Sequence, residues 1–224
     1  PMVGAEIAGG LGRAYADFRI HADGFGRMLV FDNAMTPRQR GRTVQRLLET
    51  DTYRVLALLT LPVARALMPV LGGFEAELSK ITATMSGARE ADEPQLLDRL
   101  TLLHADVVRE HTGSQFRFSA ARAYADLVGL RISELREDRI EGLQLFSEFT
   151  DRRLSPAMRT CEAAAARLSI TSERVARATQ LLSTRVGISR EKQNQALLES
   201  MDNRAKLQLR LQETVEGLSI AAIT

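Results

Sequence analysis

Apolar side chains recur every three or four residues over most of this chain, which is the spacing of helices with one buried face. The apolar stripes run through residues 44–59, 63–85, 96–107 and 118–146. They predict a mainly α fold of long antiparallel and coiled-coil-like helices. We expect the helices to supply most of the core.

Helix boundaries are marked by local signals. In "TPRQ", Thr36 is a candidate N-cap, Pro37 suits the first helical position and Gln39 completes a capping box. Pro62 predicts a kink or break in the helix that follows. Gly113 predicts an interruption further along the chain.

The last third of the chain predicts one very long helix. In "LSPAMRTCE", Ser155 is a candidate N-cap and Pro156 a first helical residue, and no proline follows. A helix over residues 156–224 would be roughly 100 Å long, which predicts a stalk helix. Its seam has alternating steps of three and four: Met158, Cys161, Ala165, Leu168, Ser172, Val175, Thr179, Leu182 and Val186, then, shifted, Leu197, Met201, Leu207, Leu211, Val215 and Leu218. The partly polar seam fits either a coiled coil between copies or a hairpin within one chain.

The first residues predict strands instead of helix. Phe18 and Ile20 alternate with Arg19 and His21, and an apolar run covers 28–31. We expect two strands joined by a tight turn at "ADGFG", a β-hairpin that belongs to a truncated α/β part. The expected domains are therefore residues 1–35, a β-hairpin remnant; 36–154, a helical domain; and 155–224, a stalk helix.

Composition narrows the classes of function. The chain has 45% hydrophobic residues, 5% aromatic residues and a formal net charge of +2. Its arginines are interleaved with Asp and Glu, and stacking aromatics are few, which argues against nucleic-acid binding. A single cysteine, Cys161, excludes an internal disulfide and favours a reducing compartment.

No catalytic constellation stands out, so we expect no enzyme and no cofactor. His21 lies among Asp17, Asp23 and Asp32, which leaves two interpretations, a metal or proton-transfer site and, favoured, an exposed strand histidine. The other polar features are interpreted structurally. His104 and His111 lack helical zinc spacing, Cys161 is expected to pack in the seam, and the charges of "ISELREDRIEGL", such as Glu134 with Asp138 and Arg139, are expected to pair locally on a solvated helix.

Several stretches resemble a bacterial family of uncharacterised membrane-anchored proteins with a domain of unknown function. They are "ADFRIHADGFGRMLVFD", "TPRQRGRTVQRLLETDTYRVLALLTLPVAR", "FRFSAARAYADLV", "DRRLSPAMRTCEA", "ERVARATQLLSTRV" and "EKQNQALLESMDNRAKLQLRLQETVEGLSIAAIT". The resemblance implies a cytoplasmic domain followed by a pair of transmembrane helices, which would begin after Thr224. Leu218, Ile220 and Ile223 are then the membrane-proximal residues, next to the bacterial inner membrane.

The layout is also similar, more distantly, to CorA-type divalent-cation transporters, in which a long helix runs into the first membrane span. The signature loop of that family would lie beyond Thr224, so no ion-site residue is carried over. Arg204, Lys206 and Arg210 precede the apolar end, which suits a cytoplasmic position for this part.

These observations favour the cytoplasmic part of a bacterial inner-membrane protein, a homo-oligomeric stalk that serves CorA-like transport of divalent cations. The alternative is a membrane-anchored coiled-coil scaffold or interaction module that moves no ions. A hydrolase built around His21 is the third and least favoured hypothesis.

Overall fold

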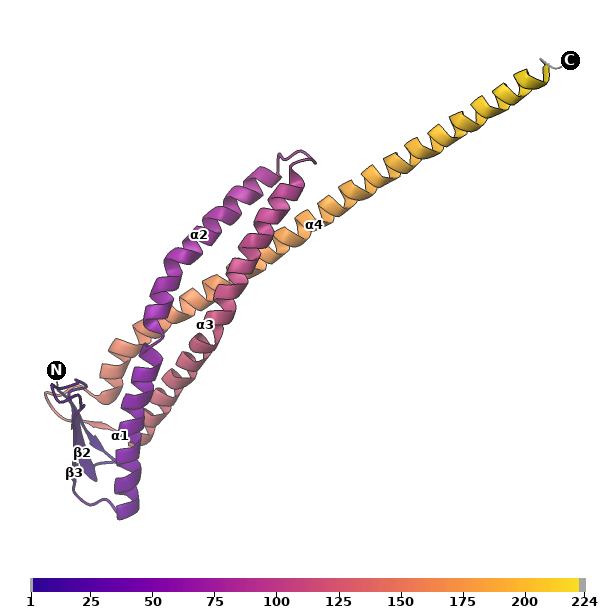
Figure 1. Cartoon of the computed structure of the whole chain (residues 1–224). Helices are drawn as coiled ribbons and strands as arrows, with labels where there is room; N and C mark the ends of the chain where they lie inside the picture. Colours follow the sequence, from indigo (N-terminus) through magenta and orange to yellow (C-terminus); the bar gives the residue numbers. More distant parts are fainter. Residues whose placement is uncertain (1, 222–224) are drawn as a thin grey trace. The chain divides into compact units, whose positions relative to one another are not determined.

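Four helices and four short strands make up the described part of the chain. The computed structural model describes the backbone of residues 2–221 and the side chains as far as residue 210. The elements are β1 (Val3–Ile7), β2 (Gly12–Ala16), β3 (Met28–Asp32), α1 (Pro37–Leu58), α2 (Leu61–Met85), α3 (Glu93–Leu135), β4 (Asp138–Arg139) and α4 (Phe146–Ala221) (Figure 1). The predicted mainly helical fold with a short N-terminal antiparallel sheet is confirmed.

The strands form one antiparallel sheet in the order β3-β2-β1-β4. Val3 pairs with Ala16, and Ala16 pairs in turn with Met28. On the other side of β1, Ala5 pairs with Arg139 of β4. Residues far apart in sequence therefore share one small sheet.

The predicted hairpin is right for one strand and wrong for the other. β3 lies where the apolar run was found, but its partner is β2 and not residues 18–21. Phe18 has a φ of 51°, which ends an extended strand, and Asp17 accepts a hydrogen bond from the backbone N–H of Arg19 at 3.1 Å. The chain therefore leaves the sheet at residue 17 and returns at Met28.

Local signals place the start of α1 and the break after it. Thr36 Oγ1 accepts the backbone N–H of Gln39 at 3.3 Å, and Gln39 Oε1 accepts the backbone N–H of Thr36 at 2.8 Å. The predicted capping box is confirmed. α1 ends at Leu58 and α2 begins at Leu61, so the break next to Pro62 is also confirmed.

Two predicted helix boundaries are wrong. α3 runs through Gly113 without interruption, because Ser114 and Phe118 beside it are buried and packing outweighs a glycine cost of about 1 kcal/mol. α4 begins at Phe146, so Pro156 lies inside the helix and Ser155 is not its N-cap. The cap is supplied from outside the helix by Glu137, as described below.

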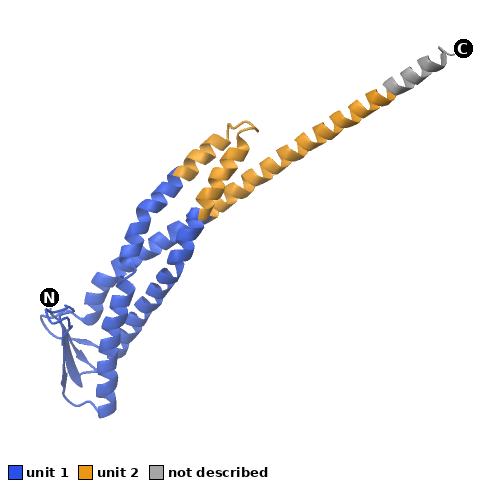
Figure 2. Ribbon diagram, viewed as in Figure 1, with its two compact units in different colours: residues 1–76, 106–172 blue, residues 77–105, 173–224 orange. Residues whose placement is uncertain are grey.

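The chain divides into two compact units (Figure 2). Unit 1 comprises residues 1–76 and 106–172. Its core joins the inner face of the sheet to one end of the helices, through Val3, Ala5, Ile7, Ala14, Ala16, Leu47, Leu135, Phe146 and Phe149. The Phe18 ring stacks on Phe149 with centroids 4.6 Å apart, which fastens the loop before β3 to α4.

Charged side chains of unit 1 bridge α1 and α3. Glu134 accepts hydrogen bonds from Arg46 at 3.0 Å and from Arg131 at 3.1 Å, and Arg131 also bonds Glu49. The partner predicted for Glu134, Arg139, is therefore wrong: Glu134 pairs with Arg46 on another helix and, locally, with Arg131 one turn earlier in α3. The helix ends at Leu135, and the charges after it belong to β4 and a turn.

Unit 2 comprises residues 77–105 and 173–224. The end of α2, the start of α3 and a stretch of α4 contribute its buried apolar residues: Leu78, Ile81, Met85, Leu96, Leu100, Leu103, Val175, Leu182 and Val186. Arg99 pairs with Glu77 at 2.5 Å, and Ser189 donates a hydrogen bond to Glu90 at 3.2 Å. Ser189 is the last residue of α4 that is buried among the described side chains.

Most positions of the first seam predicted for α4 are buried inside this single chain, whereas Ala165, Ser172 and Thr179 are half-buried. Met158, Cys161 and Leu168 are buried in unit 1, and Val175, Leu182 and Val186 in unit 2. These positions agree with packing within one chain, one of the two interpretations of the seam. A coiled coil between copies stays a prediction.

Candidate functional site

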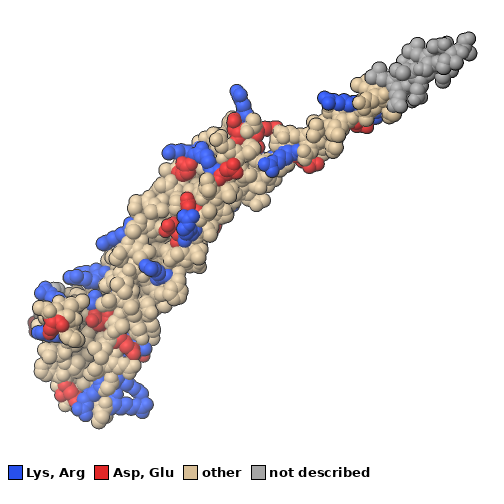
Figure 3. Space-filling model, viewed as in Figure 1, with Lys and Arg blue, Asp and Glu red and all other residues tan. Residues whose placement is uncertain are grey.

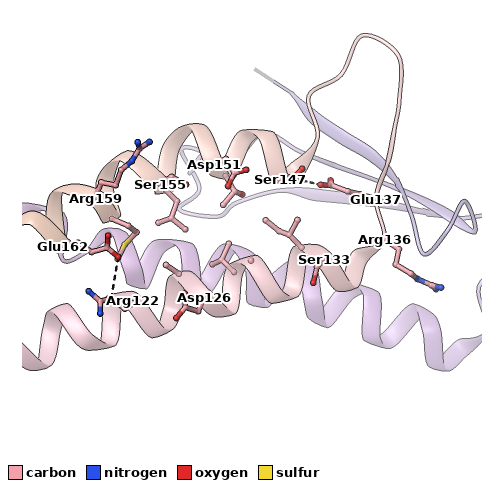
Figure 4. Close-up of a pocket in the computed structure, with 17 residues that line it drawn as sticks. Arg122, Asp126, Ser133, Arg136, Glu137, Ser147, Asp151, Ser155, Arg159 and Glu162 are labelled. Carbon is pink, nitrogen blue, oxygen red and sulfur yellow. Dashed lines mark hydrogen bonds and ion pairs between the residues drawn. The ribbon is translucent and has the colours of Figure 1, made fainter.

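A cavity of about 700 Å³ lies between α3 and the first turns of α4 in unit 1 (Figure 4). Apolar side chains such as Val128, Ile132, Leu154 and Met158 line it, together with several charged and hydroxyl groups. Among its lining residues there is neither histidine nor cysteine. The cavity is the first candidate for a binding or active site.

The polar groups around this cavity do not converge on one point. Figure 4 shows Arg159 projecting from α4 away from α3, and Asp126 and Ser133 projecting from α3 away from α4, while Arg122 and Glu162 form an ion pair across the cavity at 3.6 Å. Ser133 donates a hydrogen bond to the carbonyl of Leu130 at 2.7 Å. A nucleophile next to a base is the arrangement that acyl transfer needs, and these residues do not provide it.

Glu137, at one end of the cavity, has a structural role. Its carboxylate accepts the backbone N–H of Phe146 at 2.8 Å and of Ser147 at 2.9 Å (Figure 4). The first N–H groups of a helix lack partners within the helix, and a carboxylate there also interacts favourably with the helix dipole. Glu137 therefore caps α4 from the segment that follows α3.

Glu148 completes the start of α4. It accepts the backbone N–H of Leu145 at 3.1 Å and pairs with Arg139 of β4. The hydrogen bond from Arg139 is the main cause that lowers the pKa of Glu148, followed by the bond from Leu145. The sheet and α4 are thus joined at the point where the helix begins.

A second hollow, the β3–α1 groove, lies between the loop and strand 18–30 and one face of α1. Its volume is about 890 Å³. The residues that line it are Phe18, Arg19, Ile20, Gly24, Gly26, Arg27, Met28, Val30, Val44, Leu47, Leu48, Asp51, Arg54 and Val55. Apolar side chains and three arginines dominate this set.

Arg54 is the fixed charge of the β3–α1 groove. Its guanidinium donates to Asp51 Oδ1 at 2.5 Å and lies 5.0 Å from the centre of the Phe18 ring. The Arg54 side chain is only 12% exposed. A carboxylate on one side and an aromatic face on the other therefore hold it in one position.

The acids near His21 in sequence are dispersed in the structure. His21 Nε2 contacts Asp17 Oδ2 at 3.0 Å, whereas Asp23 pairs with Arg27 and Asp32 with Arg40. Across the described part of the chain, no three His, Cys, Asp or Glu side chains are grouped closely enough to hold a metal ion. His21 lies in the loop before β3 and not on a strand.

Cys161 is buried and lines a small cavity of about 170 Å³ in unit 1. Burial raises the pKa of its thiol, and the charge of Glu162 raises it further, so the thiol stays protonated at neutral pH. His111 lines the same cavity, a proximity that the sequence did not reveal. The packing role predicted for Cys161 agrees with its burial.

The end of α4 is the longest exposed helical stretch among the described side chains. Every residue from Arg190 to Arg210 is exposed, including Leu197, Leu198, Met201, Leu207 and Leu209. On the face shown in Figure 3, basic and acidic side chains lie next to one another along this stretch and over the units. Large apolar groups in water mark a candidate contact surface.

The predicted membrane-proximal residues lie outside the described side chains. Leu218 and Ile220 fall within the last turns of α4, and Ile223 lies beyond the described backbone. Elsewhere, Pro37–Met85 contains an 18-residue window with a mean hydropathy of 1.9, of which 28% is buried. By length and composition this stretch could cross a membrane, but a core helix passes the same test.

The fold and its cavities define a mainly helical protein with a small antiparallel sheet and no recognisable catalytic centre among the described residues. The chain belongs to the family described as "Protein of unknown function (DUF3422)", whose model matches residues 1–224. No curated protein and no solved structure matches it.

Proposed function

We propose that the chain is a non-enzymatic stalk module that associates with copies of itself through the end of α4. The observation that carries this proposal is the exposed stretch Arg190–Arg210, which follows directly on the part of α4 that is packed in unit 2. A helix without tertiary contacts has little stability of its own in water. Pairing with a second copy would supply the missing contacts.

The exposed stretch is amphipathic. At about 100° per residue, Leu197, Leu198, Met201 and Leu209 share one face of the helix. Leu207 is turned about 120° away from Met201, so it departs from the seam expected from the sequence. The opposite face carries charged and amide side chains: Glu199, Asn203, Lys206 and Arg210.

The size of the apolar face is sufficient for association. The four side chains on it are each about 60% exposed. Burying them at roughly 1–2 kcal/mol each contributes about 4–8 kcal/mol per chain. Two chains together then offset an association cost of about 4–15 kcal/mol. We expect self-association to increase with protein concentration.

Light scattering after size exclusion tests the proposal. The whole chain should elute as an oligomer, and Leu197→Glu with Met201→Glu should shift it to the monomer mass. The matched control, Gln195→Glu with Asn203→Glu, adds the same charge to other faces and should leave the oligomer intact. A monomeric wild type, or equal effects of both pairs, would refute self-association through this face.

The proposal extends to a membrane-anchored protein with this part on the cytoplasmic side. The sequence resemblance and the basic residues Arg204, Lys206 and Arg210 support it. Fractionation of cells that express the natural gene tests it, since a protein found only in the soluble fraction would contradict anchoring.

Transport of divalent cations in the CorA manner is the finer form of the proposal. Its support is the order of elements, a sheet, then helices, then one long helix. The natural full-length protein in vesicles should admit divalent cations, whereas a scaffold should admit none. A scaffold would keep the oligomer, so the two experiments separate assembly from transport.

A further inference from the structure

We propose that the β3–α1 groove binds a long-chain acyl anion, a ligand with one carboxylate and an unbranched hydrocarbon tail. This inference is independent of self-association, because the groove lies in unit 1 and the exposed stretch of α4 in unit 2.

The walls of the groove suit a hydrocarbon tail. Val44, Leu48 and Val55 line it from one side of α1 and are 42%, 57% and 44% exposed. Half-buried Met28 and Val30 line it from β3. Apolar side chains on two elements thus face a shared space, and an alkyl chain placed there would remove both sides from water.

The groove is lined by few kinds of polar side chain. Its only polar side chains are those of Arg19, Arg27, Arg54 and Asp51. No hydroxyl, amide or imidazole group lines it, whereas sugars and nucleotides need such groups for orientation. Arg54 pairs with Asp51 and Arg27 with Asp23, so the three guanidiniums exceed these carboxylates by one positive charge, which favours a ligand with a single anionic group.

Two of the arginines can reach a ligand at little cost. Arg27 pairs with Asp23 at 2.9 Å, but both side chains are largely exposed, and exposed pairs are worth little. Arg19 follows the turn at Asp17 and lines the same groove as Arg27. Arg54, held by Asp51 and Phe18, keeps positive charge at the wall of the groove.

The dimensions agree with this ligand class. Small-molecule sites have volumes of about 300–1,000 Å³, and the groove measures about 890 Å³. Ile20, which lines the groove, and Phe25, in the same loop, are 81% and 69% exposed. An acyl chain in the groove gives these side chains an apolar surface to contact.

Calorimetric titration of the delipidated whole chain with laurate, below its micelle concentration, tests the proposal. We expect saturable binding of laurate. Binding should be at least about tenfold weaker for 1-dodecanol, which lacks the carboxylate, and for butyrate, which lacks the long hydrocarbon tail. Equal binding of laurate and 1-dodecanol would overturn the role of the arginines, and absence of saturable laurate binding would overturn the site.

Paired variants locate the binding. Arg19→Gln with Arg27→Gln should weaken laurate at least about tenfold, or about 1.4 kcal/mol. Arg38→Gln, an exposed change on α1 outside the groove, should leave laurate affinity unchanged. Leu48→Gln should likewise weaken binding, whereas Leu102→Gln, at a leucine that is also exposed but lies in unit 2, should not. Equal losses in test and control variants would show non-specific adsorption and refute the site.

Discussion

The cap that Glu137 places on α4 yields the most detailed prediction. Its two carboxylate oxygens accept two backbone N–H groups at 2.8 and 2.9 Å. Loss of a helix cap costs about 0.5–2 kcal/mol, and hydrogen bonds to charged groups are worth about 1.5–3 kcal/mol each. Glu137 is half-buried, so water replaces part of the loss. We expect Glu137→Ala to lower the free energy of unfolding by about 2 kcal/mol.

Urea unfolding followed by tyrosine fluorescence measures the free energy of unfolding of unit 1, the unit that contains Glu137. All three tyrosines, Tyr15, Tyr53 and Tyr124, belong to unit 1, which also contains Glu137. Glu137→Gln keeps one acceptor oxygen and should lose about half as much. Glu141→Ala, an exposed change in the same segment, should stay within about 0.5 kcal/mol of wild type. If Glu137→Ala were as mild as Glu141→Ala, α4 would not depend on this cap.

Two further predictions follow from helix geometry and from charge. Pro156→Ala should raise the free energy of unfolding of unit 1 by about 1 kcal/mol or more, because proline inside a helix costs roughly 3 kcal/mol relative to alanine. Urea unfolding measures this gain. If there were no gain, the helix would start at Pro156. Glu49 has a lowered pKa, first through the hydrogen bond from Gln45 and then through Arg131. Its contribution is present above its unfolded pKa of about 4.3 and is lost as pH falls through the lower folded pKa. Glu49→Gln should therefore flatten the fall in melting temperature below about pH 4.3, and an unchanged acid profile would contradict the pairing.

Features encoded within a few residues could be predicted from the sequence. The capping box of Thr36 and Gln39 needs only four consecutive residues, and it is present as expected. The break at Pro62 follows from the chemistry of one residue. The buried seam Met158–Val186 follows from a regular apolar spacing.

Features that depend on residues far apart in the chain could not be predicted from the sequence. Arg46 and Glu134 are 88 residues apart, so sequence spacing suggested closer partners for Glu134. Ser155 and Pro156 form a good local start signal, but the cap from Glu137 begins the helix ten residues earlier. Tertiary contacts outweigh local preference at these points.

The β3–α1 groove was also beyond sequence reasoning. Val44, Leu47 and Leu48 form one apolar stripe, which predicts that all three are buried. Only Leu47 is buried, because the sheet covers one side of the stripe and leaves the other side open. The alternation around Phe18 predicts a strand, whereas the backbone turns there and shapes the opposite wall.

Disulfide cross-linking between copies tests the central claim, self-association through α4, most directly. With Cys161→Ala as background, Met201→Cys places a thiol on the proposed contact face, and Asn203→Cys places one on the opposite face. Paired parallel helices bring identical contact positions within the Cα separation of about 4.4–6.8 Å that a disulfide requires. We expect mild oxidation to link the Met201→Cys chains efficiently and the Asn203→Cys chains poorly. Equal linking at both positions, or none at Met201→Cys, would contradict this claim.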